Sequence, residues 1–135
     1  MISAITNEGK VRFMVYREAM NQAKLITFMG RLVRDAGRKV YLILDNLKVH
    51  HGKKVAEWLE THKDTIIVFY LPSYSPEMNP DKYLHGDLKT RVHSGTLAAT
   101  ESDLKHKTQS FMRMLVKRPY RVRSYFRHPM AAYAR

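Results

Sequence analysis

The sequence contains no cysteine, which excludes a disulfide framework and any metal site built on thiolates. No apolar run reaches the ~18 residues of a membrane span, and the first residues, MISAITNEGK, lack the basic start and apolar stretch of a secretion signal. We therefore expect a cytoplasmic protein that does not enter a membrane. The 135 residues, 44% hydrophobic and 27% charged, suit one globular domain.

Acidic residues become scarce toward the end of the chain. Residues 89–135 hold 11 Lys/Arg against two Asp/Glu, whereas residues 1–88 hold 13 against 10. The later part thus carries +9 of the formal net charge of +12. Nucleic acid phosphates are the common partner of such a segment, although an acidic protein, an anionic lipid surface or a merely solvated face would also account for it.

Apolar patterning predicts the order strand, strand, helix, strand, helix, strand, helix, helix. ISAIT and VRFMVY flank the turn residues NEGK and predict a hairpin. Helical spacing predicts helices over 19–36, around Trp58, from residue 80 to about 92 and over 101–117. VYLILDN and TIIVFYLP are almost wholly apolar, as in parallel strands covered on both faces. This order favours an α/β fold with a mixed sheet.

Asp45 is the strongest candidate for chemistry. It ends an apolar strand, and sites in open α/β sheets gather at the carboxyl ends of strands. A Mg²⁺ site would need a second carboxylate nearby, because this ion prefers oxygen ligands. The alternative is that Asp45 and Asn46 only cap a loop or form an Asx-turn.

The stretch NPDK predicts a helix start with an unusual charge. Asn79 suits the N-cap and Pro80 the first helical position, so that Lys82 falls at the third. That position favours Glu or Gln, since a carboxylate there can reach the cap amide and interacts well with the helix dipole.

Residues 42–89, LILDNLKVHHGKKVAEWLETHKDTIIVFYLPSYSPEMNPDKYLHGDLK, resemble the catalytic domain of DDE transposases. The resemblance is to the bacterial insertion-sequence branch of the Tc/mariner-like superfamily, and it extends over nearly the whole chain. The motifs that carry it are DN with a downstream His and LPxYSPxxNP.

The resemblance implies an RNase H-like fold and catalysis by two Mg²⁺ or Mn²⁺ ions held by three carboxylates. Asp45 matches the middle acid, whereas Lys82 stands in the slot of the third. A protonated lysine cannot ligate a cation and repels it. Asp81 is adjacent, but neighbouring helical residues point ~100° apart, so we do not expect Asp81 simply to replace the third acid as a metal ligand.

The first acid of the family lies on a strand that would precede Ile2, so we expect an N-terminally truncated, degenerate copy. This strand is central in RNase H-like sheets, and without it two strand pairs would keep unsatisfied edges. We therefore expect a partial domain over 1–135, with sheet and helices in 1–92 and a basic helical segment in 93–135. Such a fragment would fold poorly alone, form a homodimer or need an upstream transposase fragment.

Several other side chains are candidates for contacts to nucleic acid. His50 and His51 could touch metal or phosphate, or could simply be solvated. Trp58 is expected in the core. The aromatic residues Tyr120, Tyr125 and Phe126 could stack on bases or pack the last segment onto the domain. The basic residues expected to contact DNA are Lys89, Arg91, Arg118, Arg121 and Arg123.

The resemblance implies a function in metal-dependent DNA strand cleavage and transfer, acting on transposon ends and target DNA. The loss of two of the three acids from their expected places predicts that this copy is inactive. The alternatives are a noncatalytic nucleic-acid-binding protein and a protein that interacts with an intact transposase.

Overall fold

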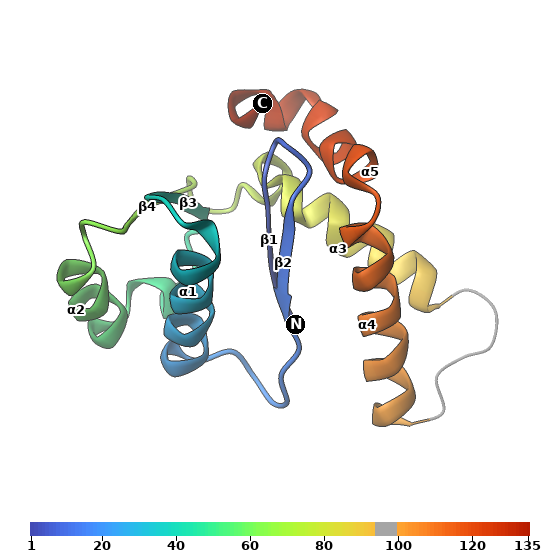
Figure 1. Ribbon diagram of the computed structural model, residues 1–135, viewed down its shortest axis with the longest axis horizontal. Coiled ribbons are helices and arrows are strands. Elements are labelled where there is room, and N and C mark those ends of the chain that lie inside the picture. The colour runs from blue at the N-terminus through green and yellow to red at the C-terminus, as the bar shows by residue number, and fades with distance from the viewer. Residues whose placement is uncertain (94–99) are drawn as a thin grey trace. The chain divides into compact units, whose positions relative to one another are not determined.

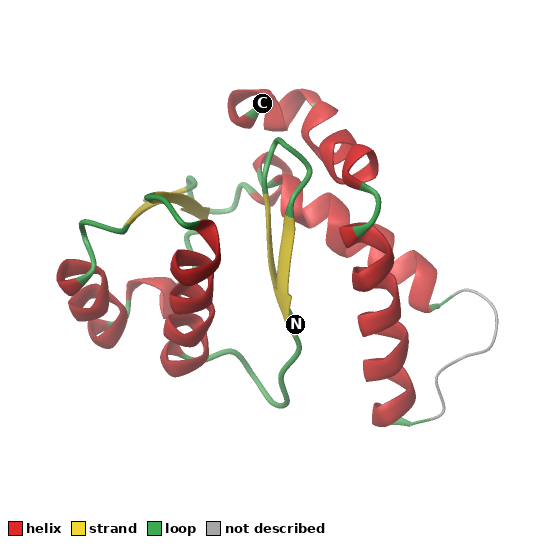
Figure 2. Ribbon diagram, in the orientation of Figure 1, coloured by secondary structure: helices red, strands yellow, loops and turns green. Residues whose placement is uncertain are grey.

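A computed structural model describes residues 1–93 and 100–135 and divides the chain into two compact units. One comprises Arg17–Pro76 and is called here the inserted unit. The other combines Met1–Tyr16 with Glu77–Arg135 and is called the split unit. Figures 1 and 2 show helices and short strands in each, and the connection 94–99 lies outside the described residues.

The inserted unit holds a parallel strand pair and two helices. Its elements are α1 (Gln22–Ala36), β3 (Val40–Leu44), the 3₁₀ turn η1 (Lys48–His51), α2 (Lys53–Thr61) and β4 (Ile66–Tyr70). The Asn21 side chain accepts a hydrogen bond from the Lys24 amide at the start of α1. Gly37 ends this helix with φ 65°, a left-handed conformation that glycine adopts without strain. α1 contacts both α2 and β3.

The parallel pairing of β3 with β4 is confirmed, but the prediction that both faces are covered is wrong. The strands pair in register from Val40↔Ile66 to Leu44↔Tyr70. Tyr41 is 65% exposed and Phe69 52% exposed, and Ile43 is exposed as well. Successive side chains of a strand point to opposite faces, so an apolar run makes both faces apolar. The run therefore does not reveal whether one face or both are covered.

The split unit joins the predicted hairpin to the helices that follow residue 80. The hairpin is β1 (Ile2–Ile5) and β2 (Val11–Met14), antiparallel with Ile2↔Met14 and Ile5↔Val11. A 3₁₀ turn η2 (Pro76–Met78) precedes the helices α3 (Pro80–Val92), α4 (Glu101–Val116) and α5 (Pro119–Ser124), and the 3₁₀ turns η3 (Tyr125–Arg127) and η4 (Pro129–Ala134) complete the chain.

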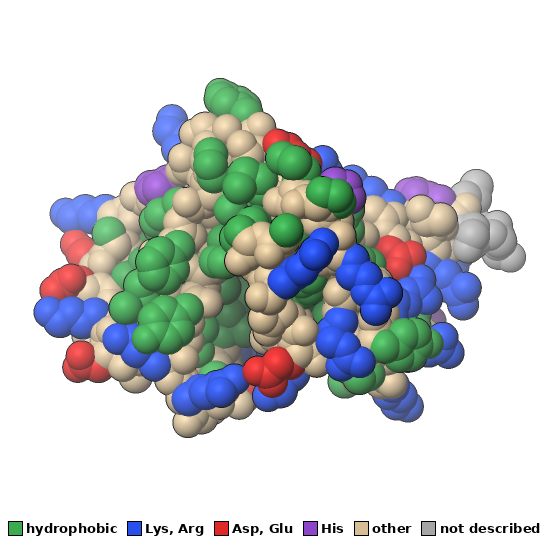
Figure 3. Space-filling view, turned by 90° about the horizontal axis from the view of Figure 1, so that it is seen from above, with side chains coloured by type: hydrophobic (Ala, Val, Ile, Leu, Met, Phe, Trp, Pro, Cys, Tyr) green, Lys and Arg blue, Asp and Glu red, His purple; other side chains and the backbone are tan. Residues whose placement is uncertain are grey.

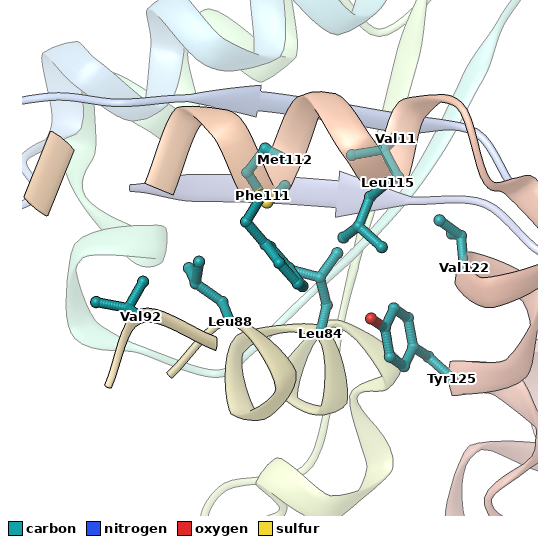
Figure 4. Close-up of a cluster of buried hydrophobic side chains, with 9 residues drawn as sticks. All are labelled: Val11, Leu84, Leu88, Val92, Phe111, Met112, Leu115, Val122 and Tyr125. Carbon is teal, nitrogen blue, oxygen red and sulfur yellow. The ribbon is translucent and has the colours of Figure 1, made fainter. Parts of the chain in front are cut away.

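One hydrophobic cluster holds the split unit together (Figure 4). Its side chains come from β2, α3, α4, α5 and η3, so that the basic C-terminal segment shares a core with the hairpin. The members are Val11, Leu84, Leu88, Val92, Phe111, Met112, Leu115, Val122 and Tyr125.

The turn of the hairpin also lies against the start of α5. Gly9 has φ 97°, and a Cβ added there would lie only 2.5 Å from the Pro119 carbonyl oxygen. Glycine is needed at this position both for the backbone conformation and for the close approach.

The predicted α/β composition is confirmed, and so are two separate strand pairs, as expected of a sheet without its central strand; one continuous mixed sheet is not observed. Within the described residues the strands form two sheets, β1–β2 and β3–β4, with two strands each. No described segment pairs with both, and a mixed sheet requires such a bridging strand. None of the helices in the described ranges is long and apolar enough to cross a membrane.

Candidate active site

Asp45 lies directly after β3, and the backbone around it is fixed by a buried histidine. His50, only 7% exposed, places its Nδ1 2.5 Å from the Asp45 carbonyl oxygen. A carbonyl only accepts, so Nδ1 carries the proton and donates it. The His50 carbonyl in turn accepts from the Tyr70 hydroxyl at 2.7 Å, and burial raises the pKa of this phenol. His50 thus holds the turn that carries Asp45, which is a more specific role than that of a solvated loop residue.

Asn46 connects the loops that follow the two parallel strands. Its amide nitrogen donates to Ser73 Oγ at 2.9 Å, and its amide oxygen is hydrogen-bonded to His51 Nε2. The His51 ring packs on Tyr70 with 4.1 Å between centroids. Asn46 therefore makes contacts across the carboxyl end of the strand pair rather than only within its own turn.

The predicted start of α3 is confirmed. Asn79 is the N-cap, its side chain accepts from the Asp81 amide at 3.0 Å, and Pro80 occupies the first helical position. Lys82 follows with an exposed side chain. The local architecture of a helix start is intact around the lysine.

The Asp81 carboxylate is engaged by β1 and by its own helix. Ser3 Oγ donates to Asp81 Oδ1 at 2.6 Å, and His85 Nε2 lies 3.2 Å from Oδ2. Ser3 Oγ also lies 3.0 Å from His85 Nε2. The spacing of four residues between Asp81 and His85 could have revealed half of this cluster, whereas nothing local to Ser3 indicates its part.

The candidate metal ligands supply too few oxygen donors for a two-metal site. Asp45 belongs to the inserted unit, whereas Asp81 and Lys82 belong to the split unit. The positions that match the middle and third acids of the family hold Asp45 and Lys82, which together provide one carboxylate and one ammonium group. In the described parts of the chain, no group of three His, Asp or Glu side chains could hold an ion. These residues do not fit the pair of Mg²⁺ or Mn²⁺ ions that the motifs imply.

Arg121 lies within the split unit, bound to Asp87. Its Nη2 lies 2.8 Å from both carboxylate oxygens, and its Nε donates to Oδ2 at 3.1 Å. The Tyr125 hydroxyl donates to Asp87 at 2.6 Å. The hydrogen bond to Asp87 raises the pKa of Arg121, and burial followed by that carboxylate raises the pKa of Tyr125. Sequence reasoning missed Asp87, and assigned Arg121 to nucleic acid instead.

The remaining predicted residues lie in mixed environments. Arg123 donates to the Glu8 carbonyl at 3.2 Å, whereas Lys89, Arg91 and Arg118 have exposed side chains. Tyr125 and Phe126 are buried, which confirms that they pack the last segment onto the domain, but Tyr120 is 60% exposed. Trp58 is half-buried and stacks on His62 with 4.0 Å between ring centroids.

Comparison with known proteins identifies the family. A search among curated proteins finds no match. The family described as DDE superfamily endonuclease matches residues 1–105, a range that includes Asp45, Asp81 and Lys82 and well over half of the chain. The chain therefore belongs to the DDE superfamily of endonucleases.

Proposed function

We propose that the chain is a transposase-type DNA-processing domain that acts in the cytoplasm, binds DNA and does not cleave it. The observation that carries this proposal is Lys82, which stands at the third position of α3 where the family resemblance implies a metal-binding carboxylate. Its ammonium group has no lone pair for a metal ion, and its charge opposes a cation bound nearby.

The contacts of Asp81 support the same conclusion. Both carboxylate oxygens already have partners, Ser3 on one side and His85 on the other. A metal ion at Asp81 would compete with these contacts, one of which satisfies the hydroxyl of Ser3, a residue only 9% exposed. Asp81 thus anchors α3 to β1 instead of replacing the acid at position 82.

The experiment is a nicking assay on supercoiled plasmid DNA with the full chain and either Mg²⁺ or Mn²⁺. We expect no metal-dependent nicking above background. Asp45→Asn is the matched control, because it identifies nicking by a contaminating nuclease, which the substitution leaves unchanged. Robust nicking by the unmodified chain that disappears in Asp45→Asn would refute the proposal.

The basic C-terminal segment favours a second candidate, a nucleic-acid-binding protein whose role involves no chemistry. Residues 89–135 hold 11 of the 24 Lys/Arg and only two of the 12 Asp/Glu. Binding of duplex DNA that weakens steeply with salt would support it. Absence of binding at low salt would eliminate this candidate and DNA processing together, leaving a protein partner such as an intact transposase, for which co-purification is the test.

A further inference from the structure

An open surface cavity at the C-terminal end of α4 is lined by three cationic side chains. It has a volume of about 310 Å³ and is lined by Ser110, Arg113, Met114, Lys117 and Arg118. These residues lie beyond the stretch 1–105 that matches the family, so the family match assigns nothing to them. Lys and Arg side chains also cover more of the face shown in Figure 3 than Asp and Glu do.

The charge around this cavity is uncompensated. Arg113 lies in the last turn of α4 and Lys117 is the C-cap of that helix, four residues later, a spacing at which like charges repel. In the described part of the chain, none of the three cationic side chains has an acidic partner. The acids of α4, Glu101 and Asp103, lie in its first turn, at the opposite end.

Arg121 provides the contrast within the same segment. Its guanidinium is held by the Asp87 carboxylate on both oxygens, and it lies over the Phe111 ring. Arg121, which has a structural role, is thus paired with a carboxylate. The three cationic side chains that line the cavity have no carboxylate partner among the described residues. Cations near a helix C-terminus interact favourably with its dipole, but this effect is modest at exposed positions and does not require three of them to line one cavity.

The chemistry of the lining suits a phosphodiester. Two guanidinium groups can donate paired hydrogen bonds to phosphate oxygens, Lys117 adds a compact charge, and the Ser110 hydroxyl is a further donor. Tyr120, 60% exposed and two residues after Arg118, offers a ring on which a base can stack.

We propose that Arg113, Lys117 and Arg118, with Ser110, form a contact site for the phosphate backbone of DNA. This inference depends on DNA being the partner, as in the proposed function, but it does not depend on whether the chain cleaves DNA. It supplies affinity and position rather than sequence recognition, because phosphate contacts carry no sequence information.

The test measures binding of a fluorescent DNA duplex to the full chain by anisotropy between 50 and 300 mM NaCl, with EDTA present so that metal chemistry plays no part. The variant Lys117→Gln/Arg118→Gln removes two charges from the site. Its control, Lys105→Gln/Arg127→Gln, removes one lysine and one arginine from exposed positions of the same unit. Circular dichroism and thermal melts check that both remain folded.

We expect the site variant to bind roughly tenfold or more weakly at 100 mM NaCl, and its plot of log affinity against log salt to be shallower by about 1.8, since each lost phosphate contact removes ~0.9 from the slope. The control should bind nearly as the unmodified chain does. Equal weakening of the two variants would show that only net charge matters and would overturn the proposal. If the site variant lost as much affinity for poly-glutamate as for the duplex, the choice of DNA as the partner would be overturned. Neither of these results would affect the outcome of the nicking assay.

Discussion

The Asp87 carboxylate binds the Arg121 guanidinium and so makes this cation less available for contacts to DNA. It accepts from the Arg121 guanidinium and from the Tyr125 hydroxyl at the edge of the split unit's core. A partly buried carboxylate needs such partners, and charge-assisted hydrogen bonds are the stronger kind. The positive charge of Arg121 therefore contributes to the fold first and only weakly to the field outside.

Tyr125→Phe tests this network, because it keeps the ring and removes the donor. We expect the free energy of unfolding to fall by about 1–2 kcal/mol in urea denaturation at pH 7. Burial and Asp87 raise the pKa of Tyr125 above its ordinary value of 10. The contribution is thus complete below about pH 10 and is lost as the pH rises through the raised pKa.

Tyr120→Phe is the matched control for that measurement. The Tyr120 side chain is largely exposed, so its hydroxyl contributes little to folding and the unfolding free energy should not change measurably. A difference between wild type and Tyr125→Phe that varied between pH 6 and pH 9 would contradict the assignment of the raised pKa.

Lys82→Glu tests whether the charge at this position prevents metal binding. We expect Mn²⁺ affinity, followed by the electron paramagnetic resonance of free Mn²⁺, to rise on the order of tenfold, because one repulsive charge becomes a ligand. Lys89→Glu makes the same charge change on the same helix, and an equal gain there would mean that only net charge had acted.

At the scale of elements, the start of α2 is stabilised by a residue of another helix. The N-cap of α2 is Gly52, which has no side chain to accept from the first amides. Gln22 Oε1, from α1, accepts instead from the Lys54 amide at 2.9 Å and the Val55 amide at 3.2 Å. The two helices are joined by a side chain that satisfies otherwise unpaired backbone donors.

Gln22→Ala should therefore destabilise the protein by about 1 kcal/mol, the usual cost of losing an N-cap. Gly52→Ala should cost a similar amount, since its Cβ would lie 2.1 Å from Gln22 Cδ and displace the same side chain. The double variant should then be little worse than either single variant in urea denaturation. Additive costs would show that the two residues act separately, and Lys53→Ala, an exposed neighbour, is the control.

These elements also show where sequence reasoning succeeds. The hairpin, the two parallel strands and the cap of α3 follow from local patterns, namely turn residues, apolar runs and the order Asn79, Pro80, Asp81. The cap of α2 by Gln22, the cluster of Ser3 with Asp81, and the pairing of Asp87 with Arg121 join residues more than 30 positions apart. Their side chains are ordinary surface types whose partners only the fold selects.

At the scale of the whole molecule, a net charge of +12 opposes the association that an apolar surface favours. Tyr41, Ile43 and Phe69 expose one apolar stretch of the β3–β4 pair, where Tyr41 and Phe69 stack with 6.5 Å between ring centroids. Two-stranded sheets also leave backbone edges that can pair with another chain. The homodimer remains a proposal that these features support.

We therefore predict self-association that increases with salt, because the Debye length falls from ~10 Å at 0.1 M to ~3 Å at 1 M ionic strength. Phe69→Lys should keep the chain monomeric at salt concentrations where the unmodified protein forms larger species, as measured by light scattering. Tyr74→Lys adds the same charge at an exposed aromatic residue outside the strands and should suppress association much less. Equal suppression by both substitutions would indicate a charge effect alone.

The insertion of residues 17–76 between the two parts of the split unit has a consequence for biosynthesis. The hairpin is synthesised before the rest of the split unit, and the core into which Val11 packs is completed only when Val122 and Tyr125 have been made. The inserted unit is contiguous and can close its own contacts earlier, so it should fold first during translation. The hairpin must then wait for the residues that follow the inserted unit, and a ribosome that stalls soon after residue 76 would leave the hairpin unpacked while the inserted unit is already folded.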